Sequence, residues 1–206
     1  MKLVQAMLAA TIGTFAIGAA ASADTVATFA DPATGPATPL FQFNSGTGTL
    51  TGGWMGQPNL LLQTPGLPSV GDYPNAQFQM TPITATGSFG GIYMMGAGAI
   101  NFFDATNAPL LTITFSNAIL TSSLGLGASD FYGYNVTFTG PILAGYGTIT
   151  NEAFSFSFAN PVGPGGPNSS FTTTSSFTSS ATLVVPGPGS AALLGLGGLL
   201  AARRRR

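Results

Sequence analysis

Apolar and polar residues alternate with a period of two along much of this chain, as they do in β-strands that bury one face. The clearest run, residues 154–158, reads Phe-Ser-Phe-Ser-Phe, and residues 111–115 alternate in the same way. Similar runs predict further strands at residues 40–43, 76–80, 83–89 and 132–138. Clusters of Gly, Pro, Asn and Asp separate these runs, which is typical of sandwiches and barrels. We therefore expect an all-β fold, a single antiparallel β-sandwich domain with a jelly-roll-like arrangement.

Two connecting segments refine this picture. Residues 104–109 are predicted to form a hairpin loop, because the side chains of Asp104 and Asn107 can satisfy backbone groups in a turn. Residues 161–170 form a loop rich in Gly and Pro, and 11 of the 14 residues from 169 to 182 are Ser or Thr. The Ser- and Thr-rich composition of residues 169–182 suits a flexible stalk, but Phe171 and Phe177 share one strand face. We therefore predict a final β-strand there and keep the stalk as the alternative.

The N-terminus has the pattern of a secretory signal peptide. A single positive residue, Lys2, precedes an apolar run over residues 6–20, and the run ends in Ala21-Ser22-Ala23. Small residues at Ala21 and Ala23 are what leader peptidases recognise, and the run is too short for a permanent membrane span. We expect residues 1–23 to be a signal helix that signal peptidase removes, so that the mature chain begins at Asp24.

The C-terminus carries a second apolar segment with an opposite arrangement of charge. Residues 190–202 contain no charged side chain, and Arg203, Arg204, Arg205 and Arg206 end the chain. As a helix, this segment spans about 20 Å, against about 30 Å for the hydrocarbon core of a bilayer. Its five leucines favour insertion by about 2 to 3 kcal/mol in total, so insertion is marginal. The arginines stay on the cytoplasmic side, which halts export and leaves the preceding chain outside.

The last twenty-odd residues resemble the PEP-CTERM sorting signal. That signal combines a Val-Pro-x-Pro motif, a short Leu/Gly/Ala-rich span and a terminal arginine cluster, and here the motif falls on Val185, Pro186, Gly187 and Pro188. Gly187 stands where the family usually has Glu. The resemblance implies a bacterial export substrate that an exosortase, a membrane protease-transpeptidase, sorts and cleaves. It also implies a structural or adhesive role, within an exopolysaccharide layer for example.

The charge of the chain excludes several partners and chemistries. Residues 24–185 contain no Lys, Arg, His or Cys, and their six acids give a formal charge of −6. Without cations this segment lacks the groups that bind phosphates, so nucleic acid is excluded as a partner. Catalytic triads, thiol nucleophiles and zinc sites built on His or Cys are excluded as well. No disulfide can form, so the core must hold by packing and hydrogen bonding.

A pair of carboxylates is the one catalytic arrangement that remains, as in glycoside hydrolases. The candidates are Asp72, Asp104, Asp130 and Glu152, and their scattered positions fit solvated surface groups better. Calcium could bind near Asp104 and Asn107, but no Asp-x-Asp-x-Asp loop is present and a turn explains both residues. We therefore expect no enzyme activity, no cofactor and no metal site.

Aromatic residues offer a possible contact with sugar rings. Trp54 lies between glycines in residues 52–56, where an exposed indole could stack on a glycan. Tyr132 and Tyr134 would share a strand face with Val136 and Phe138, which we interpret as a core face with tyrosine hydroxyls at its rim.

The sequence as a whole predicts three parts: a signal peptide at 1–23, an extracellular β-rich domain at 24–185, and a sorting segment at 186–206 with a short membrane helix at 190–202. The expected protein is non-enzymatic and exported. It passes through the inner membrane and ends at the cell surface or in the extracellular matrix. Signal peptidase, an exosortase-like protease and exopolysaccharide are its expected partners. A secreted carbohydrate-binding module is the alternative function, and a carboxylate-based glycoside hydrolase is the third.

Overall fold

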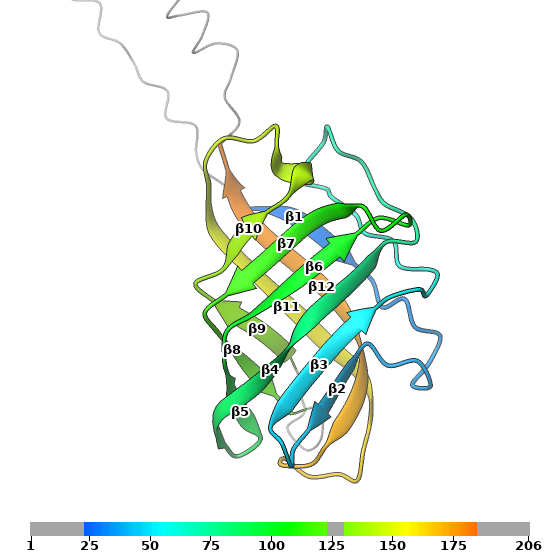
Figure 1. Ribbon diagram of the computed structural model, residues 1–206, viewed down its shortest axis with the longest axis vertical. Helices are drawn as coiled ribbons and strands as arrows, with labels where there is room; N and C mark the ends of the chain where they lie inside the picture. The colour runs from blue at the N-terminus through cyan, green and yellow to red at the C-terminus, as the bar shows by residue number, and fades with distance from the viewer. Residues whose placement is uncertain (1–22, 123–129, 185–206) are drawn as a thin grey trace, which may run out of the picture.

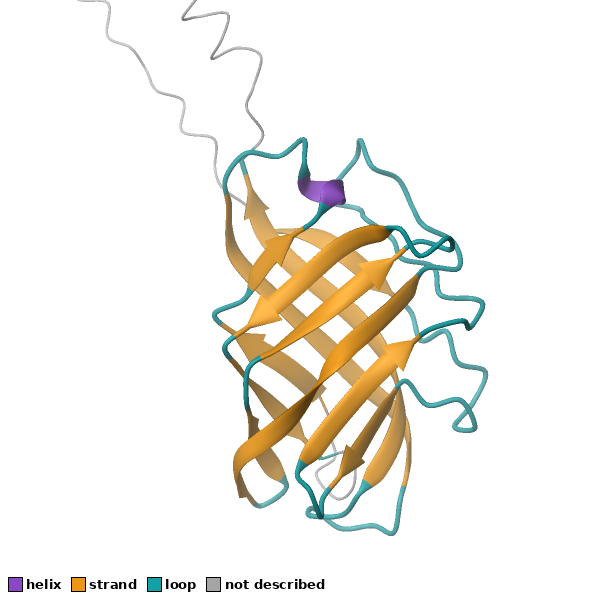
Figure 2. Cartoon of the chain, in the orientation of Figure 1, coloured by secondary structure: helices purple, strands orange, loops and turns teal. Residues whose placement is uncertain are grey.

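The computed structural model describes residues 23–122 and 130–184, and these residues form an all-β fold (Figure 2). One turn of 3₁₀-helix, η1 (Pro141–Leu143), is the sole helical element among them. The strands are β1 (Ala23–Phe29), β2 (Phe41–Asn44), β3 (Thr49–Trp54), β4 (Gln77–Phe89), β5 (Ile92–Met95), β6 (Gly98–Phe103), β7 (Pro109–Phe115), β8 (Asn117–Thr121), β9 (Asp130–Tyr134), β10 (Thr137–Thr139), β11 (Ile149–Val162) and β12 (Phe171–Leu183).

Eight of these strands close into an antiparallel barrel. Going round the ring, the order is β4-β3-β2-β12-β11-β9-β8-β5, and β5 pairs with β4 again. The remaining strands extend the sheet at one end, β6, β7 and β10 beyond β4, and β1 beyond β12 (Figure 1). Every pairing is antiparallel, so hairpins and loops suffice to connect the strands.

The predicted jelly-roll-like sandwich is therefore wrong, although the chain is all-β. β4 and β12 have 13 residues each, and both change partner along their length. β4 passes from β6 to β5, and β12 passes from β1 to β2, so one continuous sheet closes on itself. Alternation shows which residues of a strand face inward, but it does not show which strand lies at each edge. That second piece of information is what distinguishes a barrel from a sandwich.

Two predicted strand boundaries also change. The predicted strands at 76–80 and 83–89 are one strand, β4, which begins at Gln77, and Pro82 lies where β4 leaves β6 and has not yet reached β5. A proline without an N–H is tolerated at such a break in the ladder. Residues 132–138 were predicted as one strand, but Asn135 has φ of 49° and separates β9 from β10.

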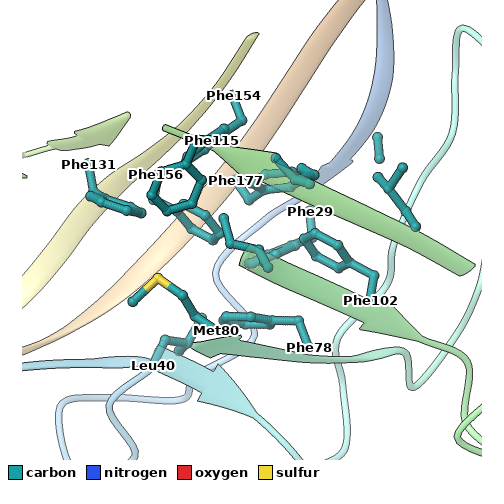
Figure 3. Close-up of a cluster of buried hydrophobic side chains, with 14 of the residues drawn as sticks. Phe29, Leu40, Phe78, Met80, Phe102, Phe115, Phe131, Phe154, Phe156 and Phe177 are labelled. Carbon is teal, nitrogen blue, oxygen red and sulfur yellow. The ribbon is translucent and has the colours of Figure 1, made fainter. Parts of the chain in front are cut away.

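Phenylalanine fills the interior of the barrel. Phe156 is completely buried, and its ring contacts six others, with centroid distances of 4.8 Å to Phe41 and Phe177. Figure 3 shows this cluster, in which rings from β1, β4, β6, β7, β9, β11 and β12 meet. An eight-stranded barrel is just wide enough for side chains to fill it. The space inside is thus core, and the surface is where a ligand or partner would bind.

The Ser- and Thr-rich segment forms strand β12, as predicted, and not a stalk. Its inward positions include Thr173, Ser175 and Ser179, each at most 1% exposed. Their hydroxyl groups bond to backbone: Ser175 donates to the carbonyl of Ser157 at 3.0 Å. Buried hydroxyls are stable only when they are paired in this way.

Ser179 connects β12 to β1 at an irregularity in the ladder. Its hydroxyl donates to the Ala27 carbonyl at 2.9 Å and accepts the Ala27 N–H at 3.1 Å, where the register shifts. We expect Ser179→Ala to lower the free energy of unfolding by about 2 kcal/mol, because two buried backbone groups lose their partner. Urea unfolding measures the difference. Ser157→Ala, at an exposed position of β11, is the control and should change little. An equal loss in both variants would contradict this role.

The two ends of the described chain lie side by side. Ala23 pairs with Thr182, so β1 begins and β12 ends at the same end of the molecule, at the top of Figure 1. The buried core lies between Val26 and Ala181, so residues 24–184 contain all of it. Of the predicted signal helix at 1–23, only Ala23 is described, and it is in strand β1, whereas the predicted membrane helix at 190–202 falls outside the described residues. Within 23–122 and 130–184, no helix has the length and apolarity to cross a membrane.

Candidate functional site

The predicted processing residues lie at or beyond the ends of the described chain. Ala21, Pro186, Gly187, Pro188 and the arginines from Arg203 to Arg206 are outside it. Ala23 is the first residue of β1, and its partner Thr182 is two residues before the last described residue. Cleavage after Ala23 would leave Asp24 paired with Ala181, so the strand would survive processing.

Trp54 does not provide a contact for a glycan in this structure. Its side chain is 4% exposed, and the indole N–H donates to the carbonyl of Pro58 at 3.1 Å. The neighbouring Gly52 permits close packing, since a Cβ atom there would lie 2.3 Å from a ring carbon of Phe41. The glycine-rich setting, which suggested flexibility and exposure, instead reflects a crowded interior.

The acidic residues are placed as turn and surface groups. Asp104 accepts hydrogen bonds from the hydroxyl and N–H of Thr106 and from the N–H of Ala108, which confirms the predicted hairpin loop. These bonds, first that from the Thr106 hydroxyl, lower the pKa of Asp104. No group of three His, Cys, Asp or Glu side chains gathers into a metal site within 23–122 and 130–184.

Asp130 and Glu152 lie on neighbouring strands but are far apart along them. Asp130 pairs with Ser157, five residues from Glu152 on β11. At about 3.3 Å per residue, the offset is about 16 Å, whereas catalytic carboxylate pairs are about 5 to 10 Å apart. These two residues therefore do not form such a pair.

Tyr132 and Tyr134 face outward, which corrects the prediction that they belong to a core face. Phe131 is the buried residue of β9, and Tyr134 is 48% exposed. Since Asn135 has a positive φ, the chain turns after Tyr134, and Val136 and Phe138 return to the interior while the tyrosines remain outside. The two tyrosine rings contact each other edge to face, with centroids 5.7 Å apart.

The register places these tyrosines in a continuous surface over four strands, which we call the outer wall. The middle row of this surface joins Gly87, Met94, Ile119 and Tyr132 across the four strands. The row nearer the β4–β5 hairpin contains Phe89 and Ile92. The row farther from that hairpin contains Asn117, which pairs with Tyr134. The outer wall comprises Gly87, Phe89, Ile92, Met94, Asn117, Ile119, Tyr132 and Tyr134. β5, β8 and β9 carry most of it, at the lower left of Figure 1.

The outer wall has a projecting residue and a hollow. Phe89, at the end of β4, is 84% exposed, more than any other large apolar side chain among the described residues. A groove of about 520 Å³ lies on the same surface and is lined by Met94, Ile119 and Tyr134 together with the polar residues Thr86, Asn117 and Asn135. Gly87 leaves space for Met94, since a Cβ atom there would lie 2.6 Å from the Met94 methyl group.

The outer wall carries little charge. Asp130 is its nearest acidic residue, at the start of β9, and it opposes ionisation of Tyr132. The pKa of Tyr132 is raised mainly by a hydrogen bond with Tyr134. Burial raises it further, as do the electrostatic interactions with Tyr134 and Asp130. Tyr132 is therefore a neutral phenol at physiological pH.

The opposite side of the barrel has a different character. β2 lies across the ring from β8, and its outward residues with those of β3 form a polar groove lined by Gln42, Asn44, Thr47, Thr49 and Thr51. Four of the eight large apolar side chains that are exposed among the described residues belong to the outer wall, and contiguous apolar patches mark interaction sites.

The signal for the outer wall was present in the sequence, in residues 89–92. Phe-Gly-Gly-Ile is a two-residue hairpin turn between apolar residues, and Gly90 and Gly91 indeed have φ of 58° and 88°. Counting outward from the turn would have placed Phe89, Ile92 and Met94 on one face. What the sequence did not reveal was that this face is outside.

Comparisons with protein-family models, with curated proteins and with solved structures found no match to this chain. Its function is therefore argued from its own residues and their arrangement.

Proposed function

We propose that this chain is an exported, non-enzymatic protein of the bacterial cell surface or extracellular matrix, with a structural or adhesive role. A signal peptidase removes its leader, and an exosortase-type protease sorts and cleaves its C-terminal segment after a transient stay in the inner membrane. The signal-like pattern of residues 1–23 and the PEP-CTERM-like pattern of residues 185–206 support this proposal.

One structural observation carries the proposal furthest, the pairing of Ala23 with Thr182. Both segments that processing would remove leave the barrel at one end. Any attachment made there leaves the other end free, and the β4–β5 hairpin with Phe89 lies at that other end (Figure 1). The arrangement suits a protein that is held by one end and contacts its surroundings with the other.

The terminal arginines provide the test. We expect deletion of Arg203–Arg206 to reduce the processed, surface-retained form several-fold, because the apolar segment loses the charges that keep its end in the cytoplasm. Cell fractionation and intact mass of the recovered protein measure this. The wild-type mass should correspond to a chain that begins at Asp24 and lacks the arginines.

The matched control replaces the four arginines with lysines, which preserves the positive charge and should preserve retention. Wild-type protein recovered from the cytosol with its arginine tail intact would refute the proposal. Equal distribution of the deletion variant and the wild type would refute the role of the arginines.

A further inference from the structure

The outer wall combines a projecting residue and a groove on one face, and this combination has a specific geometric consequence. Phe89 projects from the row nearest the hairpin, and the groove lies one to two rows further along the strands. Residues of adjacent rows are about 7 Å apart, so the two features are separated by about 7 to 13 Å. A two-fold axis between them would bring Phe89 of each copy onto the groove of the other.

A contact of this kind is isologous: the same surface serves both partners, and each contact occurs twice. The groove suits a phenyl ring, since Met94, Ile119 and Tyr134 provide apolar and aromatic sides. Met94 is itself 52% exposed and flexible enough to adjust to an inserted ring.

The charge distribution favours a second copy over other partners. The protein carries six acids between residues 24 and 185, but Asp130 is the only acid near the outer wall, where it lies at the edge. The acids Asp24 and Glu152 are on β1 and β11, away from the β4–β5 hairpin. Two outer walls can therefore meet with little repulsion, and no Lys or Arg in this segment attracts an acidic partner.

The composition of the wall points the same way. Phe89, Ile92, Met94 and Ile119 are four of its eight residues, and they have no group that bonds to a sugar hydroxyl. The groove adds the polar side chains of Thr86, Asn117 and Asn135. A partner that offers another apolar surface matches these four side chains better than a polysaccharide does.

We propose that the outer wall is a self-association surface, through which two copies of this protein pair by reciprocal insertion of Phe89 into the groove. The wall spans four strands and three rows, about 14 Å by about 13 Å, which is small for a protein interface. The pairing is therefore weak in dilute solution. Its biological meaning rests on the proposed function, because attachment to one surface raises the local concentration of copies.

Sedimentation velocity of residues 24–184, from about 5 to about 500 µM, tests the proposal over the range expected for so small a contact. These residues contain the whole described core, and a thermal melt verifies that each variant is folded. We expect a monomer–dimer equilibrium that Phe89→Ser weakens at least tenfold. Met55→Gln and Val162→Thr, at positions that are 42% and 51% exposed outside the wall, are the matched controls and should not change it.

Mixing two variants tests the reciprocal geometry. Asn117→Trp should fill the groove and weaken the dimer while Phe89 remains. A mixture of Phe89→Ser with Asn117→Trp restores one of the two contacts, since the intact Phe89 of one variant meets the intact groove of the other. The mixture should therefore associate more strongly than either variant alone.

A protein that is monomeric throughout the concentration range would overturn the proposal. Weakening by the control substitutions as strong as by Phe89→Ser would also overturn it, since general stickiness would then explain the association. Retarded migration in gels containing soluble dextran or alginate, abolished by Tyr134→Ala in a monomeric protein, would assign the wall to glycan instead. None of these outcomes depends on export, so the proposed function is tested separately by fractionation and mass.

Discussion

Substitution of Phe156 by alanine should lower the free energy of unfolding by about 3 to 5 kcal/mol. Phe156 is completely buried, and its ring contacts six other phenylalanine rings contributed by several strands of the barrel. Removing it leaves a cavity that surrounding rings cannot fill without leaving their own contacts. For a domain of this size the melting temperature should fall by roughly 10 °C. Calorimetry and urea unfolding of residues 24–184 measure both quantities.

Phe89→Ala is the matched control, because it makes the same chemical change at a side chain that is 84% exposed. It should change the free energy of unfolding by less than about 0.5 kcal/mol. If the two alanine variants lost similar stability, the phenylalanine cluster would not be the dominant support of the barrel.

Substitution of Gly140 by alanine should cost about 3 kcal/mol or more. Gly140 precedes η1 with φ of 144° and ψ of 164°, a conformation that is essentially restricted to glycine. A Cβ atom there would also lie 2.4 Å from the carbonyl oxygen of Leu110 and 2.9 Å from the Cα of Leu111, both backbone atoms of β7. Either the turn or the end of β7 must shift. Urea unfolding measures the loss.

Gly145→Ala, five residues further along, provides the comparison. A Cβ atom at Gly145 has no neighbour within 4 Å, and its φ is not positive. The variant should be as stable as the wild type or slightly more stable. A neutral Gly140→Ala would mean that the connection from β10 to η1 adopts another conformation.

Some elements of the fold were predictable because they depend on neighbouring residues alone. The alternation in residues 154–158 and 111–115 places Phe154, Phe156 and Ile113 in the core, as observed. The turn at Asp104 follows from side chains that bond to their own backbone. Strand β12 was predictable despite its hydroxyl-rich composition, because Phe171 and Phe177 are spaced for one face.

Other elements depended on contacts between distant parts of the chain. The outward position of Tyr132 follows from the break at Asn135 and from pairing with Ile119 on β8. Trp54 is buried where β3 pairs with β4, opposite Phe78, and its indole N–H donates to the carbonyl of Pro58. A period of two assigns residues to two faces without saying which face meets the core once a strand is interrupted.

The sequence by itself determined the all-β class, the lack of cations in residues 24–185, and the two terminal patterns that predict export and sorting. These properties are local or compositional, so they need no knowledge of the folded chain. The tertiary structure alone decided that the sheet closes into a barrel and that Phe89 and the groove share one face. It also decided that the two ends of the described chain pair, at Ala23 and Thr182. These depend on which strand edges pair, and edge pairing is set by packing between residues far apart in the chain, such as Phe29, Phe102 and Phe177.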